Sequence, residues 1–302
     1  MKIQALDLHF QGIPETIASY LVIGSEGPVL VETGPGSTLT MLKTQLAQAG
    51  YHPTDIKHVL VTHIHLDHAG AAGWWAQNGA QIYVHEFGAR HLIHPEKLWA
   101  SASRIYGDKM QTLWGEMLPA PPERVTAVRD GDIIEIGDLR FEAIETPGHA
   151  RHHHVFRLGN IAFTGDAAGI RLPGFNFLDI PAPPPEFDLE TWLTTLDKLN
   201  QAQFSVIYPT HYGQVKNVSE HLAQIRARLQ AVAEFVRVRM ENGMSRDDLV
   251  VAYTEWNHEL ARAAGVSESG IVHFDTVNPL YMSVDGIMRY WRKRAEAAQS
   301  AT

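Results

Sequence analysis

The strongest constraint on this chain is the segment 62–68, which reads Thr-His-Ile-His-Leu-Asp-His and follows an apolar run that predicts a buried strand at 57–62. Within six positions it holds four potential metal ligands: His63, His65, Asp67 and His68. In a loop at the end of a strand, these side chains can face one cavity without crossing the core. Imidazole and carboxylate are the ligands that zinc and related divalent metals prefer. The segment therefore predicts a metal site at the edge of a β-sheet.

Three further potential ligands follow in turn-like contexts, each at the end of a predicted strand. His149 lies in Thr-Pro-Gly-His, Asp166 in Phe-Thr-Gly-Asp and His211 in Tyr-Pro-Thr-His. A lone His-x-His pair is more often a surface pair or a locally hydrogen-bonded one than a metal site. The complete set of one clustered loop and three separate partners is far more specific.

Short β-rich runs alternate with helical patterns along the first two thirds of the chain. Strands are predicted at 20–23, 29–32, 57–62, 82–85, 132–136, 139–145, 154–158, 160–164 and around 206–207. Helices are predicted at 39–46, near 95–118, and at 189–199, 219–241, 246–263 and 283–297. We therefore expect mixed sheets in a layered α/β domain over residues 1–216, which contains the helical insert, and a C-terminal helical extension over 217–302 packed on it.

Composition excludes several classes of function. The chain has no cysteine, so disulfides, thiolate ligands and a cysteine nucleophile are excluded. A formal charge of -9 without a basic stripe disfavours nucleic acid as a partner. No apolar run approaches the roughly 20 residues that cross a bilayer, so we expect no membrane contact. The first ten residues lack the apolar stretch of a secretion signal, which predicts a cytoplasmic protein.

In the order and spacing of these motifs, residues 18–215 resemble the metallo-β-lactamase superfamily. The resemblance implies an αββα sandwich of two mixed β-sheets flanked by helices, with two metal ions at one edge between the sheets. It further implies that His63, His65 and His149 bind one metal and that Asp67, His68 and His211 bind the other. Asp166 would bridge both ions.

Two longer segments resemble an uncharacterised bacterial and archaeal branch of that superfamily. They are Gly-Ala-Arg-His-Leu-Ile-His-Pro-Glu-Lys-Leu-Trp-Ala-Ser-Ala at 88–102 and Gly-Asp-Ala-Ala-Gly-Ile-Arg at 165–171. Members of this branch are named by fold and not by substrate. This resemblance therefore sharpens the expected architecture and leaves the substrate open.

Several side chains beyond the ligands are candidates for catalysis or substrate binding. After His149 come His152 and His153, either of which is a candidate for protonating a leaving group or for orienting the ligands. An extended backbone would place them on opposite faces. Tyr212 is a candidate donor to an oxyanion, with packing as the alternative, and Asp67 a candidate for aiming the attacking water. Further candidates are Arg171 as an anion anchor and, as pocket walls or core residues, Trp99, Tyr106 and Trp114.

We therefore expect a metal-dependent hydrolase in which a hydroxide bridging two divalent ions attacks a small ester, lactone, thioester or amide. Zinc is the expected metal, and iron and manganese are alternatives. An iron-dependent oxidoreductase of the same fold, similar to persulfide dioxygenases, is the first alternative function, and a phosphodiesterase or nuclease is another. The expected partner is a small-molecule substrate, and a homodimer stays open.

Overall fold

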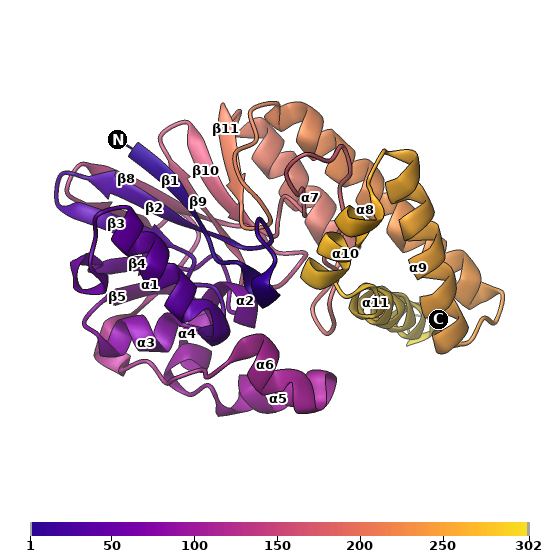
Figure 1. The fold of residues 1–302 in the computed structure, drawn as a ribbon. Coiled ribbons are helices and arrows are strands. Elements are labelled where there is room, and N and C mark those ends of the chain that lie inside the picture. The colour runs from indigo at the N-terminus through magenta and orange to yellow at the C-terminus, as the bar shows by residue number, and fades with distance from the viewer. Residues whose placement is uncertain (1, 301–302) are drawn as a thin grey trace.

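The computed structural model describes residues 2–300, in which two mixed β-sheets pack face to face with helices on both outer faces (Figure 1). The first sheet contains β1 (Lys2–Asp7), β2 (Ala18–Gly24), β3 (Gly27–Val31), β4 (His58–Leu60), β5 (Gln81–His85) and β6 (Val125–Val128) in that order. The second runs β11 (Val206–Pro209), β10 (Ile161–Gly165), β9 (His154–Leu158), β8 (Leu139–Glu145) and β7 (Ile133–Ile136). This arrangement confirms the predicted αββα sandwich.

The direction of the strands brings several chain segments to one edge of the sandwich. In the first sheet, β3 runs parallel to β4, with Val31 beside Leu60. In the second, β10 runs parallel to β11, with Gly165 beside Pro209. Parallel neighbours end at the same edge of a sheet, so the loops that leave β3 and β4 start side by side, as do the loops that leave β10 and β11.

Three apolar clusters hold the layers together. Facing side chains of the two sheets, among them Val31 and Phe156, fill the space between the sheets. The outer face of the first sheet is covered by α1 (Leu39–Gln48) and α3 (Ala72–Gln77), with Leu42 and Trp75 fully buried there. The outer face of the second sheet is covered by α7 (Leu189–Gln201), whose Trp192 is fully buried.

The predicted insert is helical. It contains α5 (Glu96–Tyr106), a short 3-10 turn and α6 (Met110–Trp114), and it follows α4 (Glu86–Ile93) directly. Figure 1 shows α5 and α6 below the sheets, beyond the helices that cover the first sheet. Met110 and Trp114 pack into the same apolar cluster as that sheet, which fixes the insert to the domain.

The last third of the chain is helical, as predicted, and consists of α8 (Val218–Glu241), α9 (Arg246–Ala263), α10 (Glu268–Val277) and α11 (Leu280–Ser300). These helices lie beyond α7 on the outer side of the second sheet (Figure 1). Ile225 of α8, Leu249 of α9 and Val284 of α11 share one buried cluster with Trp192 of α7. Among residues 2–300, no helix has the length and apolar character needed to cross a membrane.

Candidate metal centre

Four loops at one edge of the sandwich carry the predicted metal ligands. The loop after β4, with the short helix α2 (Leu66–Ala69), carries four of them, the loop between β8 and β9 carries His149, and the segments after β10 and β11 carry Asp166 and His211. The ligand atoms form two groups, and within each group they lie within 4.8 Å of one another. One group is His63, His65, His149 and Asp166, and the other is Asp67, His68 and His211. The fold thus brings together all seven residues.

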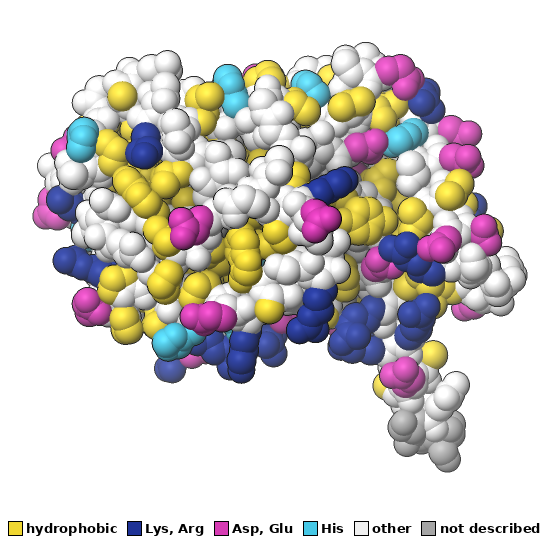
Figure 2. Space-filling model, turned by 60° about the horizontal axis from the view of Figure 1, so that its bottom comes forward, with side chains coloured by type: hydrophobic (Ala, Val, Ile, Leu, Met, Phe, Trp, Pro, Cys, Tyr) yellow, Lys and Arg dark blue, Asp and Glu magenta, His cyan; other side chains and the backbone are white. Residues whose placement is uncertain are grey.

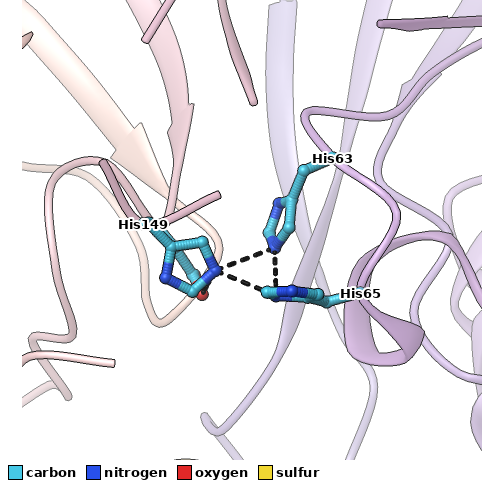
Figure 3. A group of neighbouring side chains, drawn as sticks. His63, His65 and His149 are labelled. Carbon is cyan, nitrogen blue, oxygen red and sulfur yellow. Dashed lines mark hydrogen bonds and ion pairs between the residues drawn. The ribbon is translucent and has the colours of Figure 1, made fainter. Parts of the chain in front are cut away.

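In the first group three imidazole nitrogens converge on one point (Figure 3). The Nδ1 atom of His65 lies 2.9 Å from Nε2 of His63 and 2.9 Å from Nε2 of His149. The two Nε2 atoms of His63 and His149 are 3.2 Å apart. Ligand nitrogens at 2.0–2.1 Å from a tetrahedral zinc ion lie about 3.3–3.4 Å from one another, so this arrangement needs only a small expansion to hold one.

The second group is arranged around carboxylate oxygens. Nε2 of His211 lies 3.3 Å from Oδ2 of Asp67, and Nε2 of His68 lies 3.5 Å from the same oxygen. Asp166 faces both groups, because its Oδ2 lies 3.3 Å from Nε2 of His149 and its Oδ1 lies 3.3 Å from Nε2 of His68. This is the placement that a bridging carboxylate requires.

The donor set fits two divalent cations. The Nδ1 atom of His149 lies 2.8 Å from the carbonyl oxygen of Pro181, and Nδ1 of His211 lies 2.8 Å from that of Thr16. Donation to a carbonyl places the ring proton on Nδ1 and leaves the Nε2 lone pair free to bind a metal. Within residues 2–300, the buried Nε2 of His68 and Oδ1 of Asp166 have no hydrogen-bond partner, as expected of atoms whose partner is an ion.

Burial and neighbouring charges shift the histidine pKa values of the two groups in opposite directions. Burial, together with neighbouring histidines, holds the pKa of His63 well below its usual value and lowers the pKa of His65 to about 3, so these rings are neutral and able to donate a lone pair. For His68, burial acts in the same direction, but Asp166, Asp67 and Glu32 outweigh it and raise the pKa. The second group therefore already attracts positive charge, which a metal ion supplies.

Glu32 is a candidate site residue that the sequence interpretation missed. It follows β3, is 1% exposed, and lies with Oε1 at 3.3 Å from Nδ1 of His68. Its carboxylate also accepts hydrogen bonds from the backbone N–H and hydroxyl of Thr62 and from the hydroxyl of Thr210. It thus joins the loops that follow β3, β4 and β11. The available signal was an acidic residue closing an apolar strand run.

The two candidate histidines after His149 occupy different places. His153 is fully buried, with Nδ1 2.8 Å from the hydroxyl of Thr146 and Nε2 accepting the backbone N–H of Asp166 at 3.2 Å, so it supports the bridging residue from behind. His152 lines the cavity in front of the ligands, and its Nε2 lies 3.2 Å from Glu186. Burial and the neighbouring His65 hold the pKa of His152 well below its usual value, so the ring is neutral at pH 7.

The expected alternation of His152 and His153 across an extended strand does not describe this segment. His152 lies in a turn, and extended backbone begins only at His154. The side chain of His154 packs instead against His85, with ring centroids 4.4 Å apart. The turn, and not the pleat of a strand, directs His152 towards the cavity.

Tyr212 and Arg171 are not among the described residues that line the cavity. Tyr212 is partly buried between two apolar clusters, the packing role that was the alternative for it. Arg171 takes part in positioning a ligand through its backbone, because its N–H donates to the carbonyl oxygen of His211 at 2.6 Å. The structure therefore places both residues beside the ligand loops and neither at the open face of the site.

A cavity of about 330 Å³ opens in front of the ligands, and His65, Asp67, His149 and Asp166 form its floor. The insert contributes Tyr106 and Trp114, as expected of a pocket wall, whereas Trp99 is not among the lining residues. Trp99 packs against the apolar cluster of the first sheet instead, so its core alternative holds. The opposite wall comes from a proline-rich segment at 181–185 and from residues 276–279 with Met282.

The walls of this cavity are mainly apolar. On the face that Figure 2 brings forward, apolar side chains are spread across the middle and Lys and Arg side chains gather along the lower edge. Lys97 and Arg151 are the cations that line the cavity, and Arg151 is paired with Glu186 at 2.8 Å. The site therefore combines a charged floor with apolar walls and basic groups at its margin.

Close packing fixes the backbone of the ligand loops. Gly148, in the turn before His149, has φ +131°, and a Cβ there would lie 2.4 Å from the Cα of Trp192. The Trp192 indole N–H donates to the carbonyl oxygen of Ala167 at 2.9 Å, one residue after Asp166. On the other side, the hydroxyl of Tyr20 donates to the Pro209 carbonyl and accepts the backbone N–H of Gly213 at 3.0 Å. These contacts hold three ligand loops in fixed positions.

The comparisons with known proteins agree with this fold. The model of the metallo-beta-lactamase superfamily matches residues 12–211, which is more than half of the chain. The metallo-beta-lactamase fold-containing protein ST1585 of Sulfurisphaera tokodaii is 28% identical over 222 residues, covering 71% of this chain and 80% of that protein. An atrochrysone carboxyl ACP thioesterase of Aspergillus fumigatus is 26% identical over 219 residues, covering 71% of this chain and 56% of the thioesterase.

A solved structure extends the likeness to the helical third of the chain. The metallo-beta-lactamase family protein TTHA1429 of Thermus thermophilus superposes with a TM-score of 0.72 at 22% identity. The match covers 97% of this chain and 94% of that one. The shared fold therefore includes the C-terminal helices as well as the sandwich.

Proposed function

The chain belongs to the metallo-β-lactamase superfamily, and on that basis we propose that it is a metal-dependent hydrolase with two metal ions that acts on a partly apolar ester, lactone, thioester or amide. One observation carries the proposal: two converging ligand groups form the floor of a cavity whose walls are mainly apolar. Catalytic metal sites leave a ligand position open to a substrate pocket, as this arrangement does.

The distances between the candidate ligand atoms divide them between two ions. His63, His65 and His149 would hold one ion, Asp67, His68 and His211 the other, and the two oxygens of Asp166 would reach both. When bound, two divalent ions supply a water of lowered pKa as nucleophile and a Lewis acid for the substrate carbonyl. Histidine and carboxylate ligands suit zinc, and iron or manganese as well.

The protein's own contribution is to orient groups and to keep water out. Asp67 lines the cavity, and although burial raises its pKa, His68 and His211 outweigh burial and hold the pKa well below its usual value. Its ionised carboxylate can accept a hydrogen bond from the attacking water and direct its lone pair. Tyr106 and Trp114 supply apolar contact area for the body of the substrate.

The substrate range follows from the walls. Apolar side chains favour an acyl group with hydrocarbon or aromatic character, and Lys97 at the margin would attract an anionic substituent. The likeness to a protein named as an acyl carrier protein thioesterase makes thioesters the first class to test. Every acyl derivative in the proposed class presents the same carbonyl to the metals, so the walls, and not the metals, would select among them.

A metal analysis combined with a hydrolysis panel tests the proposal. We expect about two zinc ions per chain, hydrolysis of at least one aromatic or medium-chain thioester or ester, loss of activity with a chelator, and recovery when zinc is added. Asp67→Asn should lower kcat at least 100-fold in a folded protein. Asp108→Asn is the matched control, because Asp108 is exposed in the insert and does not line the cavity.

The same panel separates the alternative functions. An iron-loaded protein that consumes oxygen and hydrolyses no acyl substrate would favour the oxidoreductase and overturn the hydrolase. Cleavage of phosphodiesters alone would favour the phosphodiesterase or nuclease. Activity that survives complete metal removal would overturn the role of the metal centre.

A further inference from the structure

The ligand His149 depends for its orientation on a loop that is far from it in sequence. Its Nδ1 atom lies 2.8 Å from the carbonyl oxygen of Pro181, in the segment between β10 and α7. An acceptor that receives the second ring N–H of a histidine ligand fixes the rotation of the imidazole and the tautomer that binds metal. The position of the Pro181 carbonyl therefore decides where the Nε2 lone pair of His149 points.

The loop at 181–185 has almost no backbone donors with which to hydrogen-bond to the rest of the protein. It reads Pro-Ala-Pro-Pro-Pro, so Ala182 is its one residue with a backbone N–H. That N–H donates to the hydroxyl oxygen of Ser283 in α11 at 3.2 Å. The loop thus has a single backbone donor, and the C-terminal helices hold it.

Two more contacts fix the residue just before the loop. The side-chain amide of Asn278, between α10 and α11, donates to the carbonyl oxygen of Ile180 at 3.2 Å, and the Ser283 hydroxyl lies 3.1 Å from the same oxygen. Ser283 is fully buried and Asn278 is 4% exposed. Buried groups with satisfied hydrogen bonds have little freedom, so the chain is held at the Ile180 carbonyl and at the Ala182 N–H, on either side of Pro181.

Steric contact and a buried carboxyl group add to the attachment. A Cβ at Gly286 of α11 would lie 1.9 Å from the carbonyl oxygen of Ala182, so the helix presses directly on the loop. One residue before Ile180, the fully buried carboxylate of Asp179 accepts a hydrogen bond from Asn278 at 2.8 Å. Arg228 of α8 approaches Asp179 to 3.6 Å. The segment 179–182 and the residues of α8 and α11 that contact it are therefore packed closely together.

We propose that Ser283 and Asn278 are positioning residues for the metal centre, which act on His149 through the Pro181 carbonyl. The described part of the C-terminal helices contributes none of the candidate ligands, and it would still set the affinity for the ion that His149 helps to bind. The region in which α10 meets α11 also lines the cavity, through Thr276–Pro279 and Met282. The same region therefore forms part of the cavity wall and orients a candidate metal ligand. The proposal rests on the proposed metal centre.

The test compares the affinities of the two ions in variants of the full chain. Metal-free wild type and Ser283→Ala are titrated with zinc against a chelating indicator, and a cobalt titration reports ligand geometry at each site through its visible absorption. In Ser283→Ala we expect at least 10-fold weaker binding at the His63, His65 and His149 position and less than 3-fold change at the Asp67, His68 and His211 position. Ser283→Thr, which keeps the hydroxyl, should restore most of the affinity.

Ser245→Ala is the matched control. Ser245 caps α9 by accepting the backbone N–H of Asp248 at 3.2 Å, so its loss weakens the same helical region without touching the loop. It should lower thermal stability and leave both zinc constants within 2-fold of wild type. Ser283→Cys, of similar volume and with a weak donor, should give an intermediate affinity and serves as the variant if Ser283→Ala does not fold.

The outcomes are distinct. Unchanged zinc constants in folded Ser283→Ala and Ser283→Cys, or an equal loss at both ions, would overturn the positioning role while leaving the metal centre intact. A wild type that binds no divalent metal would overturn the metal centre and this proposal together. Selective loss at one ion, with recovery in Ser283→Thr, supports the proposal whatever the substrate is.

Discussion

Replacing Glu32 by glutamine tests whether the buried carboxylate behind His68 tunes one metal site. Glu32→Gln keeps the shape of the side chain and one acceptor oxygen but removes the negative charge. In the folded protein that charge lies 3.3 Å from Nδ1 of His68 and accepts hydrogen bonds from Thr62 and Thr210. The amide oxygen in the Oε1 position still accepts from His68 and from the two hydroxyls. The amide nitrogen in the Oε2 position cannot accept the backbone N–H of Thr62, so a lower thermal stability should accompany the change at His68.

The magnitude follows from the hydrogen bond that is weakened. A hydrogen bond to a charged group contributes about 1.5–3 kcal/mol and a neutral one about 0.5–1.5 kcal/mol, so the replacement removes about 1–2 kcal/mol at His68. That corresponds to roughly 5- to 30-fold in the affinity of the ion that His68 helps to bind. The ion at His63, His65 and His149 has no contact with Glu32 and should change less than 3-fold.

The assay is a zinc titration of the metal-free variant that resolves two dissociation constants, together with thermal unfolding. Glu145→Gln is the matched control, because Glu145 also pairs with a histidine, His85, at 3.3 Å but is 41% exposed and lies outside both ligand groups. It should leave both constants unchanged. If the wild type binds two zinc ions, two results in Glu32→Gln would refute the assignment of Glu32 to the His68 site. These are an equal loss of affinity for both ions and unchanged affinity for both.

Three further predictions concern ligands, acid stability and the cavity wall. His65→Ala and Asp67→Ala should each lower metal content from about two ions per chain to about one, by emptying different positions; two ions retained in both would contradict the assignment. Burial lowers the pKa of His221 to about 4, so the unfolded chain binds more protons between pH 4 and 6.5 and stability is lost as pH falls through this range. When the pH is lowered from 7.5 to 5, the free energy of unfolding of His221→Gln, measured by chemical denaturation, should fall by about 2 kcal/mol less than that of wild type. An equal fall in both proteins would contradict this. Ile105 lines the cavity and is 40% exposed, so Ile105→Ala should raise KM about 3- to 10-fold with little change in thermal stability. Trp99→Ala should instead lower the free energy of unfolding by about 2–4 kcal/mol without raising KM. The reverse pattern would show that Trp99 contributes to the cavity wall.

The sequence was most informative where local pattern and chemistry coincide. The segment at 62–68 follows an apolar strand and carries four potential ligands that a shared cavity can satisfy, so the position of the site could be predicted without a structure. The separate ligands His149, Asp166 and His211 were recognisable because each lies in a turn-like segment that follows a strand. Which oxygen of Asp166 faces which group depends on tertiary geometry and could not be read from the chain.

The elements that escaped prediction have weak local signals. The helix α10 contains Gly270 and four β-branched residues, which disfavour a helix in isolation. It forms because Ser267 caps it and because Gly270 allows close contact with the ring of Phe175. Strand β6 is mostly exposed and is held by pairing with β5 and by the buried side chain of Val128, which are long-range contacts that periodicity does not report.

The cavity wall was only partly predictable for the same physical reason. The spacing of Trp99, Tyr106 and Trp114 indicates a shared helix or core face, and all three contact the apolar cluster of the first sheet. Trp99 and Tyr106 lie seven residues apart in α5, and Trp114 follows in α6 after a turn at Gly107, but only Tyr106 and Trp114 line the cavity. The opposite wall, from Pro279 and Met282, is distant in sequence and lacks any motif. Helical pattern reports which residues are apolar and leaves open which neighbour covers them.

The candidate ligands and one wall of the cavity come from different parts of this chain. All seven candidate ligands lie within residues 12–211, the span that the superfamily model matches, and they are held by strand ends that the sandwich fixes. Part of the cavity wall lies beyond that span, at 276–282. Likeness across 12–211 consequently supports the metal chemistry and carries no information on the wall that contacts the far side of a substrate. Because Ser283 and Asn278 join that wall to the Pro181 carbonyl, a change in the wall that moves the loop also moves a ligand, so substitutions in α11 should alter substrate range and metal affinity together.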